Sequence, residues 1–260
     1  MKSGKPTSDP QLTPRDGKIL RHVATFGLTT FATLRQVFFA GQEVDAVKST
    51  LRRLCGSGPA GRYLKAEKLD GQRVYYRLAR HGAKALGMSY KRARAFGRQA
   101  LYQRLAILWF IHDAQHSGRR FIDYRQLAVE FGIQVDPIPR HVCYLEPDPA
   151  GPRLGIVMAD HSAEASRLVR KAAVVLGSFL RRGWFDDLIR DRAFVLTIVT
   201  MSEGKKAALE SLFPIAVRST LKKQLARLEA NVGDGQHIAL KVVVVEELAN
   251  LLPGMEADSP

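Results

Sequence analysis

The sequence predicts a two-domain protein of the α+β class, in which a small helical domain with a β-hairpin precedes an α/β domain. Apolar residues recur at helical spacing in three successive segments before residue 56. The dipeptide Asp70-Gly71 separates two strand-like segments, and strand-like and helical segments alternate after residue 117. At 260 residues, of which 46% are hydrophobic, the chain is long enough to form two separate cores.

A first helix is predicted to begin at Pro14 and to end before Gly27. Thr13 is a suitable N-cap, proline is favoured at the first helical position, and Asp16 follows in the first turn. Glycine after the last apolar residue is typical of a helix C-terminus. The apolar stripe of this helix consists of Ile19, Leu20, Val23 and Phe26.

Two more helices are predicted on either side of a short turn, "AGQ". In "TTFATLRQVFF", Thr29 or Thr30 is placed to cap a helix whose buried residues are Phe31, Leu34, Val37 and Phe38. The third helix is expected over Val44–Cys55, and its apolar residues are Val44, Val47, Leu51 and Leu54. The opposite face of the third helix presents Asp45, Lys48, Ser49, Arg52 and Arg53 to solvent.

The segment "YLKAEKLDGQRVYYRL" predicts a β-hairpin, because Asp-Gly is a strong signal for a two-residue turn. The residues expected to face the core are Leu64, Ala66, Val74, Tyr76 and Leu78. The residues around the tip are Lys68, Gln72 and Arg73. A short helix over residues 80–86 is expected to complete the domain.

The remaining boundaries follow from composition and periodicity. Residues 1–11 are expected to form a flexible arm, 12–88 the first domain, 89–116 a connecting helix, 117–253 an α/β domain and 254–260 a flexible tail. The connecting helix, with its pattern over 91–115, is apolar around most of its circumference and is a candidate for a dimer interface. In the second domain the expected strands are "HVCYLEP", "RLGIVMAD", "AFVLTIVT" and "IALKVVVV". The expected helices are "AEASRLVRKAAVVLGSFLRRG" and the segments 203–212 and 215–230.

The net charge of +15 is confined to the first part of the chain. Residues 1–104 contain 21 Lys and Arg against 6 Asp and Glu, whereas the remaining residues contain 19 of each kind. A basic domain attracts polyanions, and the release of counterions favours its binding to nucleic acid. The alternative is a solvated basic surface with no partner, but segregation of the charge into one domain favours a nucleic-acid partner.

Three helices followed by a hairpin is the order of elements in a winged helix-turn-helix domain. In that arrangement the third helix enters the major groove of double-stranded DNA, where Arg52 and Arg53 are the candidates for reading guanine. Lys48 and the tip of the hairpin are expected to contact phosphates. The full set of predicted DNA-contacting residues is Thr30, Arg35, Lys48, Ser49, Arg52, Arg53, Lys65, Lys68, Gln72 and Arg73.

A Mg²⁺-dependent nuclease is the competing interpretation, and it depends on the second domain. Asp160 follows a predicted strand, and Lys171 lies eleven residues later on a predicted helix. One carboxylate is too few to hold Mg²⁺, so Asp160 is interpreted as a strand-end or helix-capping residue. His141 and Cys143 share a predicted strand face but have no further ligand nearby, and no catalytic residue, metal site or cofactor is predicted.

The segments "LTPRDGKILRHVATFGLTTFATLRQVFF" and "YYRLARHGAKAL" resemble the replication-relaxation proteins of plasmids and mobile elements. The resemblance implies an N-terminal winged helix followed by a degenerate restriction-endonuclease-like core. "RLGIVMADHSAEASRLVRKA" is similar to that core at Asp160 and Lys171. It departs from the pattern at Met158, where the family has an acidic residue, and this departure favours an inactive core.

The sequence therefore predicts a sequence-specific double-stranded DNA-binding protein that is not an enzyme. We expect a homodimeric transcriptional regulator of a mobile element or prophage-like locus, bound to a palindromic operator. It is expected to be cytoplasmic and associated with the nucleoid, because no signal peptide or membrane span is apparent. The alternative is a plasmid replication or relaxation protein, or a nuclease, acting on DNA.

Overall fold

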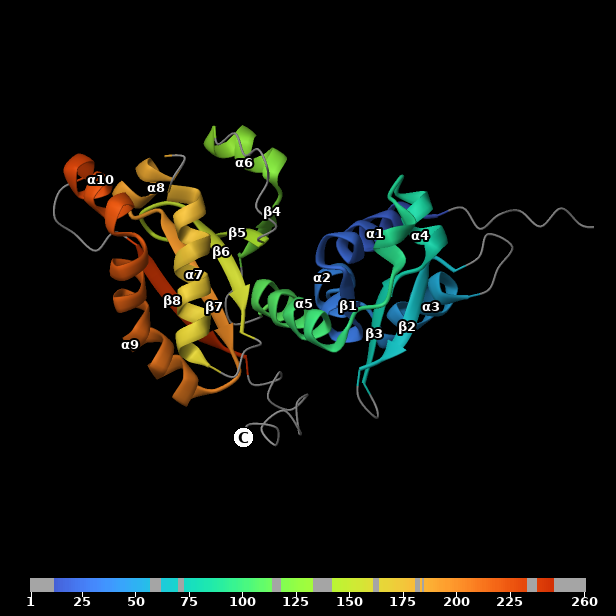
Figure 1. The fold of residues 1–260 in the computed structure, drawn as a ribbon. Coiled ribbons are helices and arrows are strands. Elements are labelled where there is room, and N and C mark those ends of the chain that lie inside the picture. Colours follow the sequence, from blue (N-terminus) through green and yellow to red (C-terminus); the bar gives the residue numbers. More distant parts are fainter. Residues whose placement is uncertain are drawn as a thin grey trace, which may run out of the picture. The chain divides into compact units, whose positions relative to one another are not determined.

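A computed structural model of the chain divides into two compact units, Met1–Leu108 and Trp109–Pro260 (Figure 1). The structure describes residues 12–56, 62–69, 73–113, 118–132, 142–160, 164–180, 183, 185–232 and 238–245. The predicted arm at 1–11, the tail at 254–260 and the turn residues Asp70, Gly71 and Gln72 lie outside these ranges.

The first unit contains the predicted helices and hairpin together with one additional short strand. Its elements are α1 (Pro14–Phe26), β1 (Leu28–Thr30), α2 (Phe31–Phe38), α3 (Val44–Cys55), β2 (Leu64–Lys68), β3 (Val74–Leu78), α4 (Arg80–Ala85) and a 3-10 helix (Tyr90–Ala93). Helix α5 (Arg98–Ile111) begins in this unit and continues past the boundary at Leu108.

Helix α1 begins and ends where the sequence predicts. The Thr13 hydroxyl accepts a hydrogen bond from the Asp16 backbone N–H (3.2 Å), and the Asp16 carboxylate accepts one from the Thr13 N–H (2.8 Å). This reciprocal capping box satisfies two donors that the first turn of a helix leaves open. At the other end Gly27 adopts a left-handed conformation with φ of 86°, and its N–H donates to the Val23 carbonyl.

The core of the first unit lies between α1, α2, α3 and the hairpin. Its fully buried members include Ile19, Leu20, Val23, Leu34, Val47, Leu54, Leu64 and Leu78. Val37 was predicted to be buried, but it is exposed. Helix α2 ends at Phe38, and the next residue, Phe39, takes the core position instead.

The three strands of this unit form an antiparallel sheet in the order β1-β3-β2. Strand β1 was not predicted, because three residues are too few to show periodicity. The hairpin pairs in register with Leu64 opposite Leu78, and these two residues, with Tyr76 packed beside them, face the core as predicted. Tyr75 and Arg77 are buried, while Val74 and Tyr76 are only half-buried and Ala66 is exposed.

The predicted continuous helix over 91–115 is interrupted before α5. In a continuous helix the Ala93 carbonyl would accept from the N–H of Gly97. Here it accepts a hydrogen bond from the Arg77 guanidinium of β3. The chain therefore forms a 3-10 turn capped by Ser89, passes through four non-helical residues, and becomes α-helical only at Arg98.

The second unit contains a five-stranded mixed sheet in the order β4-β5-β6-β7-β8. Strand β5 (Val142–Glu146) is antiparallel to β4 (Arg120–Ile122) and to β6 (Arg153–Ala159). Strands β6, β7 (Phe194–Thr200) and β8 (Ala239–Val244) are parallel. The four strands expected from the sequence are confirmed, and β4 is an addition.

The helices of the second unit are α6 (Tyr124–Phe131), α7 (Ala165–Leu180), α8 (Asp186–Arg190), α9 (Glu203–Thr220) and α10 (Lys222–Val232). Helices α7 and α9 lie side by side against one face of the sheet (Figure 1). Helices α6 and α8 were not predicted. The two helices expected over 203–212 and 215–230 are divided differently, because α9 continues through Pro214 and buries Phe213 and Val217 on either side of it.

The core beneath α7 and α9 is almost entirely aliphatic and aromatic. Its members include Leu154, Ile156, Met158, Leu168, Leu176, Phe179, Leu196, Ile198 and Phe213. No helix among the described residues is both long and apolar enough to cross a lipid bilayer.

The opposite face of the sheet is packed through Tyr144, whose ring lies against Gly155 on the neighbouring strand. A Cβ atom at Gly155 would lie 2.2 Å from two ring carbons of Tyr144. The tyrosine ring cannot move away freely, because its hydroxyl makes a 2.6 Å hydrogen bond to Thr197 and its edge packs on Phe110. This close approach requires glycine at position 155.

We expect Gly155→Ala to lower the free energy of unfolding by about 1–3 kcal/mol, because the added methyl group overpacks the sheet face. The matched control is Gly204→Ala, at a helical glycine whose added Cβ would meet nothing within 4 Å. Alanine there should be neutral or stabilising by about 0.5–1 kcal/mol. Urea unfolding of the full chain measures both, and equal effects at the two positions would contradict the packing argument.

Candidate nucleic-acid interface

The division of charge coincides with the division into units. The first unit, residues 1–108, contains all 21 Lys and Arg and all 6 Asp and Glu counted above, and so has a net charge of +15. The second unit carries 19 of each and is neutral. The excess positive charge therefore belongs to the first unit.

Helix α3 presents the predicted polar face to solvent. Lys48, Ser49 and Arg52 are all exposed on it. Lys48 pairs with Asp45 one turn earlier at 3.5 Å, an exposed contact of a kind that contributes at most about 1 kcal/mol. The Arg52 side chain has no hydrogen-bonding or ion-pair partner within the described residues, so it is free to meet a ligand.

The hairpin lies beside α3. Strand β2 packs against the helix, and the N–H of Tyr63 donates to the carbonyl of Leu54 at 3.0 Å. Lys65, Lys68 and Arg73 are exposed on the hairpin, and Lys65 pairs with Glu67 at 2.9 Å. Gln72 lies outside the described residues. The structure thus places the predicted cations of the helix and of the hairpin on neighbouring elements of one unit.

The two predicted contacts from the region of α2 have different environments. Arg35 is exposed on the helix. Thr30 is buried, and its hydroxyl accepts from the Thr33 N–H at 3.2 Å and bonds the Thr33 hydroxyl at 3.0 Å. Thr30 therefore serves as the N-cap of α2, and its side chain is removed from the set of candidate DNA contacts.

Arg53 differs from its neighbour Arg52, because its guanidinium turns toward α1. Its two terminal nitrogens donate to the two oxygens of Asp16 at 2.6 and 2.7 Å, and the Asp16 side chain is only 1% exposed. Burial by itself would raise the pKa of Asp16, but the hydrogen bonds from Arg53 and Thr13 outweigh it, and the net pKa is lowered. Arg53 thus has a structural partner that Arg52 lacks within the described residues, although its side chain is still 41% exposed.

A second charged network stiffens the hairpin. Arg77 on β3 donates to Glu67 on β2 at 2.7 Å, and the Tyr75 hydroxyl donates to the other oxygen of Glu67 at 2.5 Å. These hydrogen bonds, the Arg77 bond foremost, lower the pKa of Glu67 to about 2. Burial, and then the bond to Glu67, raise the pKa of Tyr75 to about 12. The network explains why Tyr75 and Arg77 are buried.

In the second unit Asp160 is a buried ion-pair residue at the end of β6. Its carboxylate lies 2.7 Å from the Lys205 ammonium of α9 and accepts a 3.1 Å hydrogen bond from the Thr200 hydroxyl. Lys171, which the resemblance associates with Asp160, is exposed on α7. Sequence reasoning missed Lys205, since nothing local marks a lysine 45 residues away as the partner of Asp160.

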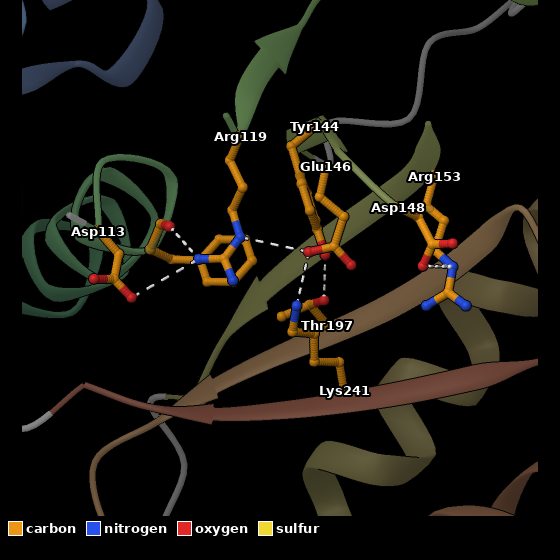
Figure 2. Close-up of polar contacts among 9 residues, drawn as sticks. Asp113, Arg119, Tyr144, Glu146, Asp148, Arg153, Thr197 and Lys241 are labelled. Carbon is orange, nitrogen blue, oxygen red and sulfur yellow. Dashed lines mark hydrogen bonds and ion pairs between the residues drawn. The ribbon is translucent and has the colours of Figure 1, made fainter. Parts of the chain in front are cut away.

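A further polar cluster lies on the sheet face that α7 and α9 do not cover (Figure 2). Glu146 accepts from Lys241 at 2.7 Å and lies 3.5 Å from the Nε atom of Arg119. The buried Arg119 guanidinium stacks on the Phe110 ring, 4.1 Å from its centroid, and donates to the Phe110 carbonyl. Asp148 and Arg153 form a separate pair at 3.1 Å. These contacts neutralise the carboxylates and connect β5 to β8.

Within the described ranges, no three His, Cys, Asp or Glu residues come close enough together to hold a metal ion. His141 lies outside those ranges, and Cys143 is buried, which raises the pKa of its thiol to about 12. Comparison with protein-family models, with curated proteins and with solved structures returned no match for this chain. Exposed cations on α3 and the hairpin remain the strongest candidate for a functional surface.

Replacing Asp16 should reveal its structural role. We expect Asp16→Ala to lower the free energy of unfolding by about 1–3 kcal/mol, because it removes the cap of α1 and the charge-assisted hydrogen bonds to Arg53, whose side chain is 41% exposed and can be solvated by water. Asp45→Ala is the matched control, since it removes the exposed partner of Lys48 and should cost less than about 1 kcal/mol. Similar losses in the two variants, measured by urea unfolding, would show that the buried pair is unimportant.

The depressed pKa of Glu67 gives stability a defined pH dependence. A carboxyl whose pKa is lowered on folding stabilises the folded state above its ordinary value of 4.5, and that stabilisation is lost as the pH falls toward about 2. Wild type should therefore exceed Glu67→Gln in unfolding free energy at pH 7, and the difference should shrink as the pH falls below about 4.5. A difference that stays constant over this range would exclude the network as its source.

Proposed function

We propose that the protein binds double-stranded DNA through the first unit, with α3 in the major groove and the β2–β3 hairpin against the backbone. The observation that carries this proposal is the confinement of the whole net charge of +15 to the unit that presents α3 and the hairpin. The absence of net charge on the second unit favours this proposal over a general need for solubility, because that need would apply to both units.

The arrangement of elements supports a winged helix-turn-helix interpretation of this unit. Helices α2 and α3 are separated by a short turn at residues 39–43, and the three-stranded sheet ends in a hairpin that lies beside α3. In this interpretation α3 is the recognition helix and the hairpin is the wing. The helix is long enough, at 12 residues, to span the groove with its exposed face.

Individual roles follow from the environment of each cation. Arg52 is the candidate for reading a guanine edge through two parallel donors, because it is exposed and has no partner within the described residues. Ser49 lies on the same exposed face. The proposed phosphate contacts are Arg35, Lys48, Lys65, Lys68 and Arg73.

We infer further that the protein is a homodimeric transcriptional regulator that acts on a palindromic operator. A two-fold axis would place two α3 helices one turn of DNA apart, about 34 Å. The resemblance to the replication-relaxation proteins supports a mobile-element setting, and the second unit, which has no net charge, suits contacts with a second copy or a partner protein. Cleavage of DNA is not part of the proposal, because Asp160 is already paired with Lys205.

The decisive variant is Arg52→Ala. If Arg52 reads a base, this variant should weaken binding to a DNA duplex taken from upstream of the gene that encodes the protein. The expected loss is about 5- to 150-fold in affinity, which corresponds to about 1–3 kcal/mol. Binding to an unrelated duplex should change much less. Fluorescence anisotropy at fixed salt measures both affinities.

Arg98→Ala serves as the control, since it removes the same charge from an exposed position of the same unit, outside α3 and the hairpin. It should alter the affinity for either duplex by no more than about threefold, the effect of one remote charge. Equal losses for Arg52→Ala and Arg98→Ala would mean that binding uses net charge alone and that α3 is not the recognition helix.

A further inference from the structure

The first unit contains a cavity of about 160 Å³ that the DNA-binding proposal does not use. It lies at the Leu78 end of β3, whereas the hairpin turn lies beyond Val74 at the other end of the strand. The cavity is open to solvent on one side and is lined by the last turns of α1, the end of β3, the segment after α4 and the first half of α5. It is far larger than the roughly 10–15 Å³ that a single water molecule needs.

One part of the cavity wall is apolar and another is strongly basic. Its apolar side is formed by Val23, Ala24, Leu78 and Phe96. Its cationic side is formed by Lys91, Arg92, Arg94 and Arg104. The lining includes no aspartate or glutamate, although four cations surround the space.

Lys91, Arg92 and Arg94 are exposed, whereas Arg104 is half-buried. Burial, and then the charge of Arg92, lower the pKa of Arg104, which shows that its charged form is disfavoured where it stands. An anion in the cavity would offset both effects, since it would accept hydrogen bonds from the guanidinium and lie between the cations.

The wall is a built structure held by its own hydrogen bonds. Arg104 donates to the Phe26 carbonyl at 2.9 Å and stacks on the Phe96 ring. The Ala93 carbonyl is held by Arg77, and the Ser89 hydroxyl caps the 3-10 helix by accepting from the Lys91 N–H. The cavity is therefore formed before any ligand arrives, and such preorganisation reduces the cost of binding.

We propose that this cavity binds a small organic anion, a carboxylate with an apolar body. The carboxylate would lie among the arginines, where a planar guanidinium offers two parallel donors, and the apolar body would contact Val23, Leu78 and Phe96. A bare inorganic anion would leave that apolar wall without contacts. The site lies at the Leu78 end of β3, at the opposite end of the strand from Val74.

The test is titration of the full-length protein with sodium benzoate, followed by calorimetry at constant ionic strength. Wild type should bind one benzoate saturably. Arg94→Gln and Phe96→Ala should each weaken binding about tenfold or more. The first variant removes a guanidinium that binds the carboxylate, and the second removes an apolar contact with the body of the ligand. Arg98→Gln, an exposed position outside the cavity lining, should bind as wild type does.

Absence of saturable binding to wild type would overturn the proposal, and so would equal affinities in all four proteins. Inorganic phosphate that binds as tightly as benzoate would overturn the assignment of an organic ligand. Circular dichroism of each variant verifies that it is folded. Because the titration contains no DNA, its outcome is independent of whether the first unit binds DNA.

Discussion

The buried carboxylate of Asp16 is the polar contact that joins two helices of the first unit. It caps the start of α1 through Thr13 and accepts two hydrogen bonds from Arg53 in the last turn of α3, so one side chain connects the two helices. The buried apolar face of α3, formed by Val47, Leu51 and Leu54, leaves Arg52 and Ser49 on the side that faces solvent. The ion pair ties this helix to α1 through an anion that is fully buried. Removal of Arg53 would leave the buried Asp16 carboxylate without its charged partner, which is more costly than loss of a surface contact.

The two units use charge in different ways. In the second unit the buried carboxylates Asp160 and Glu146 each have a lysine partner, Lys205 and Lys241, and the unit is neutral as a whole. In the first unit only some of the cations are balanced, and the excess remains on exposed positions of α3, of the hairpin and of the cavity wall. Such an excess repels itself and is tolerated where anions bind. The first unit accordingly presents two anion-attracting surfaces of different chemistry, an open one suited to a duplex and a half-enclosed one suited to a small ligand.

The elements that the sequence predicted well are those whose signals are local. Thr13, Pro14 and Gly27 mark both ends of α1, and apolar residues at spacings of 3 and 4 locate α3. The errors come from partners distant in sequence. No local signal shows that Arg53 pairs with Asp16, which lies 37 residues earlier. The helix predicted over 91–115 is too long, because the Ala93 carbonyl accepts a hydrogen bond from Arg77, a residue of β3. Within the candidate site, sequence predicted which cations are exposed, but it could not distinguish Arg52 from Arg53, since adjacent residues of one type differ only in their surroundings.

The salt dependence of DNA affinity tests the central claim most directly. If the excess charge of the first unit binds a duplex, the logarithm of the association constant should fall linearly with the logarithm of the salt concentration. For six or more phosphate contacts, affinity should drop by about a thousandfold between roughly 50 and 200 mM salt. Full-length protein and a fluorescent duplex are sufficient for the measurement. Affinity that is absent at the lower salt concentration, or that stays unchanged across this range, would contradict the account.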